Sequence, residues 1–369
     1  MTAATRDSET SPPARRPEAP QRLARLRVDA KAVAANWRYF DKLAPNAITA
    51  AVVKANAYGL GAAPAAKTLA KAGARVFFTA TAGEGVAVRR ALGEGPQIFV
   101  LGGPTESDVA HFASARIVPV LNSIAQLKLW DARGPAGLHI DTGMNRLGIG
   151  PEELIAAASA LKDAELSLIM SHLACASDAR HAMNATQLQR FIDAASLFPK
   201  APLSLAATAG ALLGADYHFD MIRPGIGLYG SGGLDADNPT LAAAAIVEAP
   251  ILQVRSVDAG ESFGYGASFT ASRKLRAATL GIGYADGFLR SLGGRGYGVL
   301  AGRRCPLLGR VSMDLVVIDV SACVEAAPGA WVELLGPNAP LDDVAACAGT
   351  APYEILTTLV GGVRRGARS

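Results

Sequence analysis

The 369-residue chain has little cysteine, few aromatic residues and little charge, and these shortages exclude several classes of protein. Its four cysteines show no CxxC spacing, which argues against a zinc site or a disulfide framework and fits a reducing, cytoplasmic compartment. No stretch approaches a membrane-spanning run free of charged and turn residues. The formal net charge of +4 is small for this length, so neither a nucleic-acid partner nor an acidic membrane surface is expected.

What the chain has in abundance is apolar sequence, which makes up 50% of its residues. A chain of this length is too long for one ordinary core, so we expect two domains. Residues 1–21 are rich in Pro, Arg, Ser and Thr and lack an apolar segment. That composition is typical of a disordered tail and not of a secretory signal.

Short apolar runs recur along the first part of the chain, separated by Ala- and Leu-rich segments of helical character. These runs are AITAAVV (47–53), ARVFFTAT (74–81), QIFVLG (97–102), RIVPVLN (116–122), GLHIDTG (137–143), LSLIMSHL (166–173), LSLAAT (203–208) and MIRPGIGLYG (221–230). Strands that alternate with helices indicate a parallel sheet. Eight such units predict an α/β fold with a closed (β/α)8 barrel over residues 22–241, and an open doubly wound sheet is the alternative.

Beyond residue 242 the pattern changes to β-like segments separated by Gly and Pro turns. This pattern predicts a mostly-β C-terminal domain over residues 242–369. The early segment 22–29 is also strand-like and precedes the barrel pattern, so its position leaves it free to pair with the second domain.

Polar residues stand where several of the predicted strands end. They are Lys54 after the first strand, Arg146 in the turn after the fifth, His172 and Thr208 at the ends of the sixth and seventh, and Arg223 within the eighth. In a (β/α)8 barrel these positions face one rim, where active sites are built. A lysine there usually extends its amine to solvent, whereas one held at the base of a site is suited to covalent chemistry. Five converging strand ends predict a site.

Eight motifs resemble, in the same order, those of the alanine racemase family that uses pyridoxal 5'-phosphate (PLP). They are AVVKANAYGLG, HIDTGMNRLG, SHLACASD, IRPGIGLYG, FGYGASF, GIGYADG, GRVSMD and YEIL, and the likeness extends over residues 22–365. The family's fold is a PLP-binding barrel followed by a β domain. The resemblance implies an isomerase that interconverts L- and D-alanine for peptidoglycan synthesis and forms a head-to-tail homodimer with shared active sites.

The resemblance also implies two catalytic bases on opposite faces of the substrate's Cα. Lys54 corresponds to the lysine that binds PLP covalently and serves one face, and Tyr265 of the partner subunit serves the other. Arg223 corresponds to the arginine that faces the pyridine nitrogen. A carboxylate at that place would stabilise a protonated ring nitrogen, whereas a guanidinium leaves the nitrogen unprotonated. Reprotonation at Cα is then favoured over transamination. His172 is expected to bridge Arg223 and the catalytic tyrosine.

The other residues implied by the resemblance form a cofactor set and a substrate set. The cofactor set comprises Lys54, Tyr58, Leu101, Arg146, His172, Thr208, Arg223, Gly225, Ile226 and Tyr353. The substrate set comprises Arg146 together with Tyr265, Tyr284, Met313 and Asp314. No metal site is implied.

One departure from the family pattern lies at His139, where members often carry a carbamylated lysine that orients the arginine matching Arg146. An imidazole cannot form a carbamate. A hydrogen bond from His139 and an anion in the same space are the two alternatives.

Three other functions compete with alanine racemisation. A broader amino-acid racemase of the same fold would accept serine or larger side chains. A non-catalytic PLP-binding barrel would lack the second domain, which is present here with Tyr265, Met313 and Asp314. A decarboxylase on the related two-domain fold would be expected to lack the arrangement at Arg223.

Overall fold

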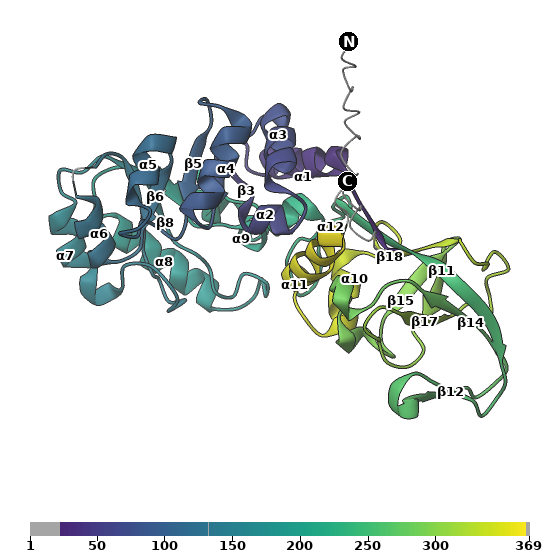
Figure 1. The fold of residues 1–369 in the computed structure, drawn as a ribbon. Helices are drawn as coiled ribbons and strands as arrows, with labels where there is room; N and C mark the ends of the chain where they lie inside the picture. The colour runs from purple at the N-terminus through teal and green to yellow at the C-terminus, as the bar shows by residue number, and fades with distance from the viewer. Residues whose placement is uncertain (1–22, 132, 367–369) are drawn as a thin grey trace, which may run out of the picture.

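The computed structural model describes residues 23–131 and 133–366, so the predicted tail at residues 1–21 lies outside the described part. Figure 1 shows two lobes, one built of parallel strands wrapped by helices and the other built around an antiparallel sheet. None of the helices in the described ranges has the length and apolarity that a membrane crossing needs.

The barrel begins with one strand divided into two stretches by Ala50. β2 (Ile48–Thr49) pairs in parallel with β10 (Met221–Ile222), and β3 (Ala51–Val52) pairs in parallel with β4 (Val76–Thr79). From β4 the parallel ladder continues through β5 (Gln97–Val100), β6 (Val118–Leu121), β7 (Ala136–His139), β8 (Leu166–Met170) and β9 (Leu203–Ser204). Strands enclosed on both faces have little need of polar alternation, and all four residues of β4 are buried.

The ring closes between β9 and β10. The Arg223 N–H donates to the carbonyl oxygen of Ala206 at 2.9 Å, and a β-bridge joins Ala207 to Arg223. The predicted (β/α)8 barrel with a mostly-β C-terminal domain is therefore confirmed.

The last barrel strands are shorter than the apolar runs that predicted them. β10 stops before Pro224, which has no N–H to contribute to a ladder, and the chain turns into the 3₁₀ helix η3 (Ile226–Tyr229). Thr208 opens α9 (Thr208–Leu212), and its Oγ1 accepts hydrogen bonds from the N–H groups of Gly225 at 2.9 Å and Gly227 at 3.1 Å. This hydroxyl fixes the loop after β10 to the end of β9.

The outer helices turn one apolar face toward the barrel. In α3 (Ala62–Ala72) the neighbours Ala65 and Ala66 are buried, and Leu69, one turn further on, is buried on the same face. Several helices begin at side-chain caps, such as Thr81 of α4 (Ala82–Leu92) and Ser123 of α6 (Ile124–Trp130). The others of this layer are α1 (Ala30–Leu43), α5 (Val109–Ala115), η1 (Pro151–Glu153), α7 (Leu154–Ala160), α8 (Met183–Ala195) and η2 (Ala215–Tyr217).

The second lobe is organised around β11 (Ala245–Val257), whose length lets it pair with different neighbours along its course. It pairs antiparallel with β18 (Trp331–Leu335) in its first half and with β14 (Leu275–Leu280) in its second. The sheet also contains β15 (Tyr297–Leu300), β16 (Arg303–Pro306) and β17 (Val316–Asp319). A separate hairpin joins β12 (Ser262–Phe263) to β13 (Phe269–Thr270), and the chain ends in α10 (Leu341–Ala348), α11 (Pro352–Ile355), the π-helical η7 (Leu356–Val360) and α12 (Gly361–Gly366).

The first strand of the chain belongs to this second sheet. β1 (Arg25–Val28) precedes α1 and pairs antiparallel with β11. The Arg25 guanidinium lies 2.9 Å from a Glu248 carboxylate oxygen and stacks 3.8 Å from the Trp331 ring centroid. β1 and β11, which precede and follow the barrel in the sequence, therefore pair with each other in the sheet of the β domain.

The Thr208 hydroxyl provides a test of how the barrel closes. Thr208→Ala leaves two buried N–H groups without an acceptor, so we expect the free energy of unfolding to fall by about 1–3 kcal/mol. Thr208→Ser keeps the hydroxyl and is the matched control. Urea denaturation of the three proteins measures the difference, and equal midpoints for the Ala and Ser variants would contradict this account.

Candidate active site

The carboxyl ends of the barrel strands bring three cations and two histidines into one cluster. The pKa of His172 lies well below its usual value because the ring is desolvated and because Arg223, Arg146, Lys54 and His139 lie near it. These residues are far apart in sequence, so the closed barrel is what brings them together. Of the five predicted strand-end residues, Lys54, Arg146, His172 and Arg223 belong to this cluster, whereas Thr208 bonds to the loop after β10.

Lys54 is positioned by an unusual turn of backbone. In α2 (Lys54–Tyr58), residues 55–58 all have positive φ, between 51° and 55°, which is left-handed geometry that costs about 1–2 kcal/mol per non-glycine residue. The Asn56 side-chain oxygen accepts a hydrogen bond from the Ala62 N–H at 2.8 Å and joins this turn to α3. Strain of this kind is typical of functional sites, where the surroundings hold it in place.

The surroundings of Lys54 favour its neutral amine. Burial lowers its pKa, and the positive charges of Arg146 and Arg223 lower it further, while Glu84 acts in the opposite direction. An amine that loses its proton more readily than an exposed lysine is a better nucleophile toward a carbonyl group.

Arg223 is a buried cation whose guanidinium is held from several sides. It is 3% exposed; its Nη1 donates to Ser204 Oγ, and its Nη2 donates to the carbonyl oxygens of Ser171 at 2.7 Å and Leu205 at 3.3 Å. Burial lowers its pKa to about 9, which leaves the group charged at neutral pH. No hydrogen bond joins its side chain to His172 within the described residues.

A second part of the rim offers neutral donors suited to an anion. The Tyr58 ring lies 5.0 Å from the Tyr229 ring and 6.1 Å from that of Tyr353, which comes from α11 of the β domain. Burial raises the pKa of Tyr58 and Tyr353, so both phenols keep their protons. η3 begins at Ile226 beside Thr208, and the first N–H groups of a helix have no partner inside it.

Asn122 is a site residue that the sequence analysis missed. It follows β6, and its Nδ2 donates to the carbonyl oxygens of Leu101 at 3.0 Å and Val120 at 2.7 Å. Its Oδ1 lies 2.8 Å from Nδ1 of His139. A polar residue at the end of the run RIVPVLN was the available signal, since it matches the pattern that identified the other strand ends.

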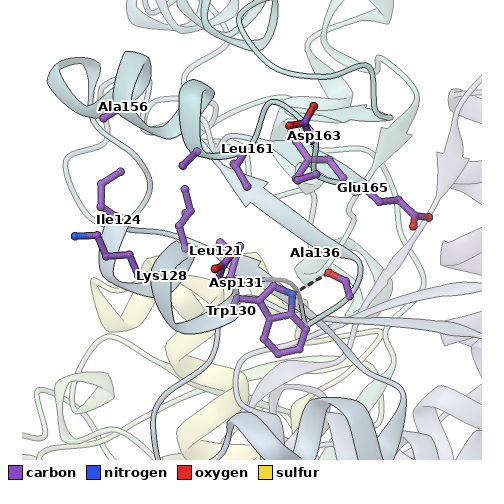
Figure 2. A pocket seen from close by; sticks show the side chains of 15 residues that line it. Leu121, Ile124, Lys128, Trp130, Asp131, Ala136, Ala156, Leu161, Asp163 and Glu165 are labelled. Atoms are coloured by element: carbon purple, nitrogen blue, oxygen red, sulfur yellow. Dashed lines mark hydrogen bonds between the residues drawn. The ribbon is translucent and has the colours of Figure 1, made fainter.

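Two cavities differ in their relation to this cluster. One of about 660 Å³ is lined by His172, Ala207 and Tyr353, so it opens from the rim, between the barrel loops and the β domain. Another, of about 880 Å³, lies on the outer wall between α6 and α7 and includes none of the predicted site residues (Figure 2). Its charged residues Lys128 and Glu165 extend away from its apolar centre. The chemistry is therefore associated with the cavity at the rim.

Tyr265, the base predicted from the second domain, lies apart from this rim. Tyr265 is 72% exposed in the 3₁₀ turn η4 (Tyr265–Ala267), and Figure 1 shows its hairpin, labelled β12, at the end of the β lobe remote from the barrel. Tyr284 and Met313 are 44% and 54% exposed, and the Tyr284 and Met313 loops are linked because the Ala285 N–H donates to the Met313 carbonyl oxygen. Asp314 follows in the same loop. Within one chain, the Tyr265 hairpin therefore does not reach Lys54.

Comparison with known families matches both lobes. A family model described as the alanine racemase N-terminal domain matches residues 28–232, and one described as the alanine racemase C-terminal domain matches residues 244–367.

Relatives and solved structures agree with these models. Alanine racemase of Cereibacter sphaeroides is 48% identical over 341 residues, which cover 91% of this chain and 95% of the relative, and that of Rhodospirillum rubrum is 45% identical over 93% and 97%. The structure of Bartonella henselae alanine racemase with covalently bound pyridoxal phosphate aligns with a TM-score of 0.85 at 38% identity, covering 91% and 97% of the two chains. The biosynthetic alanine racemase from Pseudomonas aeruginosa aligns with a TM-score of 0.86 at 35% identity, covering 92% and 97%. This chain therefore belongs to the alanine racemase family.

Proposed function

We propose that this protein is a PLP-dependent racemase that interconverts L- and D-alanine and supplies D-alanine for peptidoglycan. The observation that carries the proposal is the setting of Lys54, a partly buried lysine at the rim of the barrel whose pKa is lowered by burial and by two arginines. A primary amine in this state suits reversible covalent attachment of a carbonyl cofactor.

The charges and donors at the rim fit PLP. The phosphate and phenolic oxygen of PLP are negatively charged, and the rim concentrates Lys54, Arg146 and Arg223 around partly buried histidines. We assign the phosphate to Tyr58, the O–H of Thr208, Tyr353 and the backbone N–H of Ile226, since loops after the last strands of such barrels commonly bind phosphate. Gly225, also in the predicted cofactor set, donates its N–H to Thr208 Oγ1 and would hold that hydroxyl in place. Leu101 and His172 are assigned to the walls of the cofactor site.

The reaction is assigned to two bases on opposite faces of Cα. When bound, PLP supplies the electron sink that makes the Cα proton acidic enough to be removed. Lys54 Nζ moves that proton on one face, and Tyr265 Oη of the partner subunit moves it on the other. Arg146 binds the substrate carboxylate and orients Cα between the two bases.

Arg223 has a different role from the bases. A guanidinium that faces the pyridine nitrogen donates a hydrogen bond but keeps its own proton. With PLP bound, Arg223 would leave the ring nitrogen unprotonated, which would favour return of a proton to Cα over transamination.

Exposure of the second-domain residues supports a dimer with shared sites. The exposed faces of Tyr265, Tyr284 and Met313 leave large apolar or aromatic surface uncovered in one chain. In a head-to-tail homodimer this surface covers the partner's rim and brings Tyr265 to the partner's Lys54, with Tyr284, Met313 and Asp314 around the substrate carboxylate.

The first prediction concerns the covalent anchor. Lys54→Ala should lose both the visible absorbance of bound cofactor and the exchange of the alanine Cα proton in heavy water, because the amine provides both attachment and a base. Lys67→Ala, which removes an exposed lysine of α3, should keep both. A colourless but fully active Lys54→Ala enzyme would overturn the assignment. Running the same exchange assay on serine and lysine separates an alanine racemase from a broader one.

The second prediction separates the two bases. Tyr265→Phe should reduce racemisation by roughly 10²–10⁴-fold, the usual contribution of a positioned base, while cofactor absorbance is retained. One enantiomer should still exchange its Cα proton without inversion, because Lys54 remains on its face. Chiral analysis combined with mass spectrometry in heavy water measures both, and inversion at the unchanged rate would contradict the role of Tyr265.

The third prediction concerns the shared site. When inactive Lys54→Ala and Tyr265→Phe subunits are mixed and allowed to exchange, half of the sites in each mixed dimer contain neither substitution. Activity should return to about a quarter of the unmodified level for random exchange in a symmetric dimer. Native mass spectrometry confirms that mixed dimers have formed, and mixed dimers without activity would refute shared sites.

A further inference from the structure

Gln187 is a fully buried polar residue of α8 to which the proposed mechanism gives no role. Its side-chain hydrogen bonds all reach the loops that follow two neighbouring barrel strands, β7 and β8. Nε2 lies 3.0 Å from Thr142 Oγ1 and 3.0 Å from the His172 carbonyl oxygen, and Oε1 lies 2.8 Å from the Ala174 backbone nitrogen. One side chain therefore joins two loops of the rim to the helix behind them.

The partners of Gln187 fix the orientation of its amide. The Ala174 N–H can only donate and the His172 carbonyl can only accept, so Oε1 must face the first and the NH₂ group the second. The other N–H of the amide is directed at Thr142 Oγ1, which accepts it. Thr142 keeps its own proton for Ser171 Oγ, which lies 2.8 Å away. The hydrogen bonds thus continue from α8 to the residue that precedes His172.

The backbone of the loop after β8 is held on both sides of His172. On the side toward the barrel, the Ser171 carbonyl oxygen accepts a hydrogen bond from Nη2 of Arg223 at 2.7 Å. On the side toward α8, Gln187 binds the carbonyl of His172 and the N–H of Ala174. Each peptide group next to His172 therefore has a partner outside its own loop.

The ring of His172 has no comparable support. Among the residues that the structure describes, none forms a hydrogen bond with either of its ring nitrogens. The ring nevertheless lies near Arg223, Arg146 and Lys54, and residues 172–174 line the cavity of about 660 Å³ at the rim. Because no partner holds the ring itself, its direction depends on the backbone that carries it.

We propose that Gln187 is a positioning residue that fixes the backbone of His172 and so holds the imidazole toward the cofactor site. This proposal rests on the function proposed above, in which His172 lines that site. Groups that act in catalysis keep their geometry only when hydrogen bonds and packing behind them hold it. Gln187 acts through the loop, since its amide contacts backbone groups and one hydroxyl and does not face the cavity.

Kinetics of the holoenzyme test this role. Gln187→Met keeps the length of the side chain and removes its donors and acceptor. We expect kcat for alanine racemisation to fall about tenfold to a hundredfold, as misplacement of a group near the reacting atoms does. KM should change little, because the substrate carboxylate is assigned to Arg146. The control is Gln189→Met, which alters an exposed residue of the same helix bonded to Asp193 and should leave both constants unchanged.

A double-mutant cycle with His172 separates positioning from a general structural role. His172→Leu should itself lower kcat, and Gln187→Met in that background should cause little further loss. Equal losses from Gln187→Met in both backgrounds would overturn the proposal, and so would an unchanged kcat for His172→Leu.

Nuclear magnetic resonance of nitrogen-15-labelled histidine gives a readout that does not depend on activity. The chain has five histidines, and His172→Leu identifies the ring signal of His172. That signal should shift or broaden in Gln187→Met and stay unchanged in Gln189→Met. An unmoved signal in Gln187→Met would contradict the proposal. If Gln187→Met does not fold, Gln187→Leu takes its place, with thermal unfolding as the check.

Failure of the proposed function is distinguishable from failure of this role. An unmodified enzyme that binds no PLP, or does not exchange the alanine Cα proton in heavy water, would refute the proposed function itself. Intact exchange with additive losses in the cycle would refute only the role of Gln187.

Discussion

The concentration of positive charge at a partly buried rim is the constraint on which the rest of the site depends. Burial lowers the pKa of His139 and of His172, Arg223 and Arg146 lower both further, and Lys54 adds to the effect on His172. The opposing carboxylates are Asp141, which acts on His139, and Glu84, which acts on Lys54. Cations removed from water are costly unless counter-charges and hydrogen bonds compensate. A phosphorylated cofactor and an amino-acid carboxylate bring such counter-charges, so their binding also compensates the positive charge at this rim.

The backbone around the rim is fixed by hydrogen bonds from polar side chains. Lys54 precedes a run of left-handed residues that would be unfavourable in an isolated peptide. Its continuation is fixed by the Asn56 side chain at the start of α3, and on the far side of the strand Thr208 fixes the loop that follows β10. Both devices use one polar side chain to satisfy backbone N–H groups. The lysine is thereby kept at the end of its strand, where its amine meets the arginines.

The sequence allowed the architecture and most of the rim to be predicted, because both follow from local patterns. Alternating apolar runs and helical segments predicted the barrel, and Lys54, His172 and Arg223 were identified by their positions at strand ends. The left-handed turn was not predictable in detail, since alanine and asparagine are compatible with many conformations. The Asn122–His139 hydrogen bond was not predictable either, because it depends on the register between β6 and β7, which only the closed barrel determines.

In the proposed dimer, the separation of Tyr265 from the rim makes catalysis depend on assembly. Its hairpin is ordered within one chain: Ser262 pairs with Thr270, and the Phe263 and Phe269 rings meet edge to face at 5.7 Å. The backbone that carries Tyr265 is therefore folded without a partner. Positive charges stabilise a phenolate that is brought beside them, and the only such cluster described above is at the barrel rim. In the proposed dimer, each subunit supplies the cations that the other subunit's tyrosine needs to act as a base. A single subunit contains the rim cations and Tyr265 but does not bring them together.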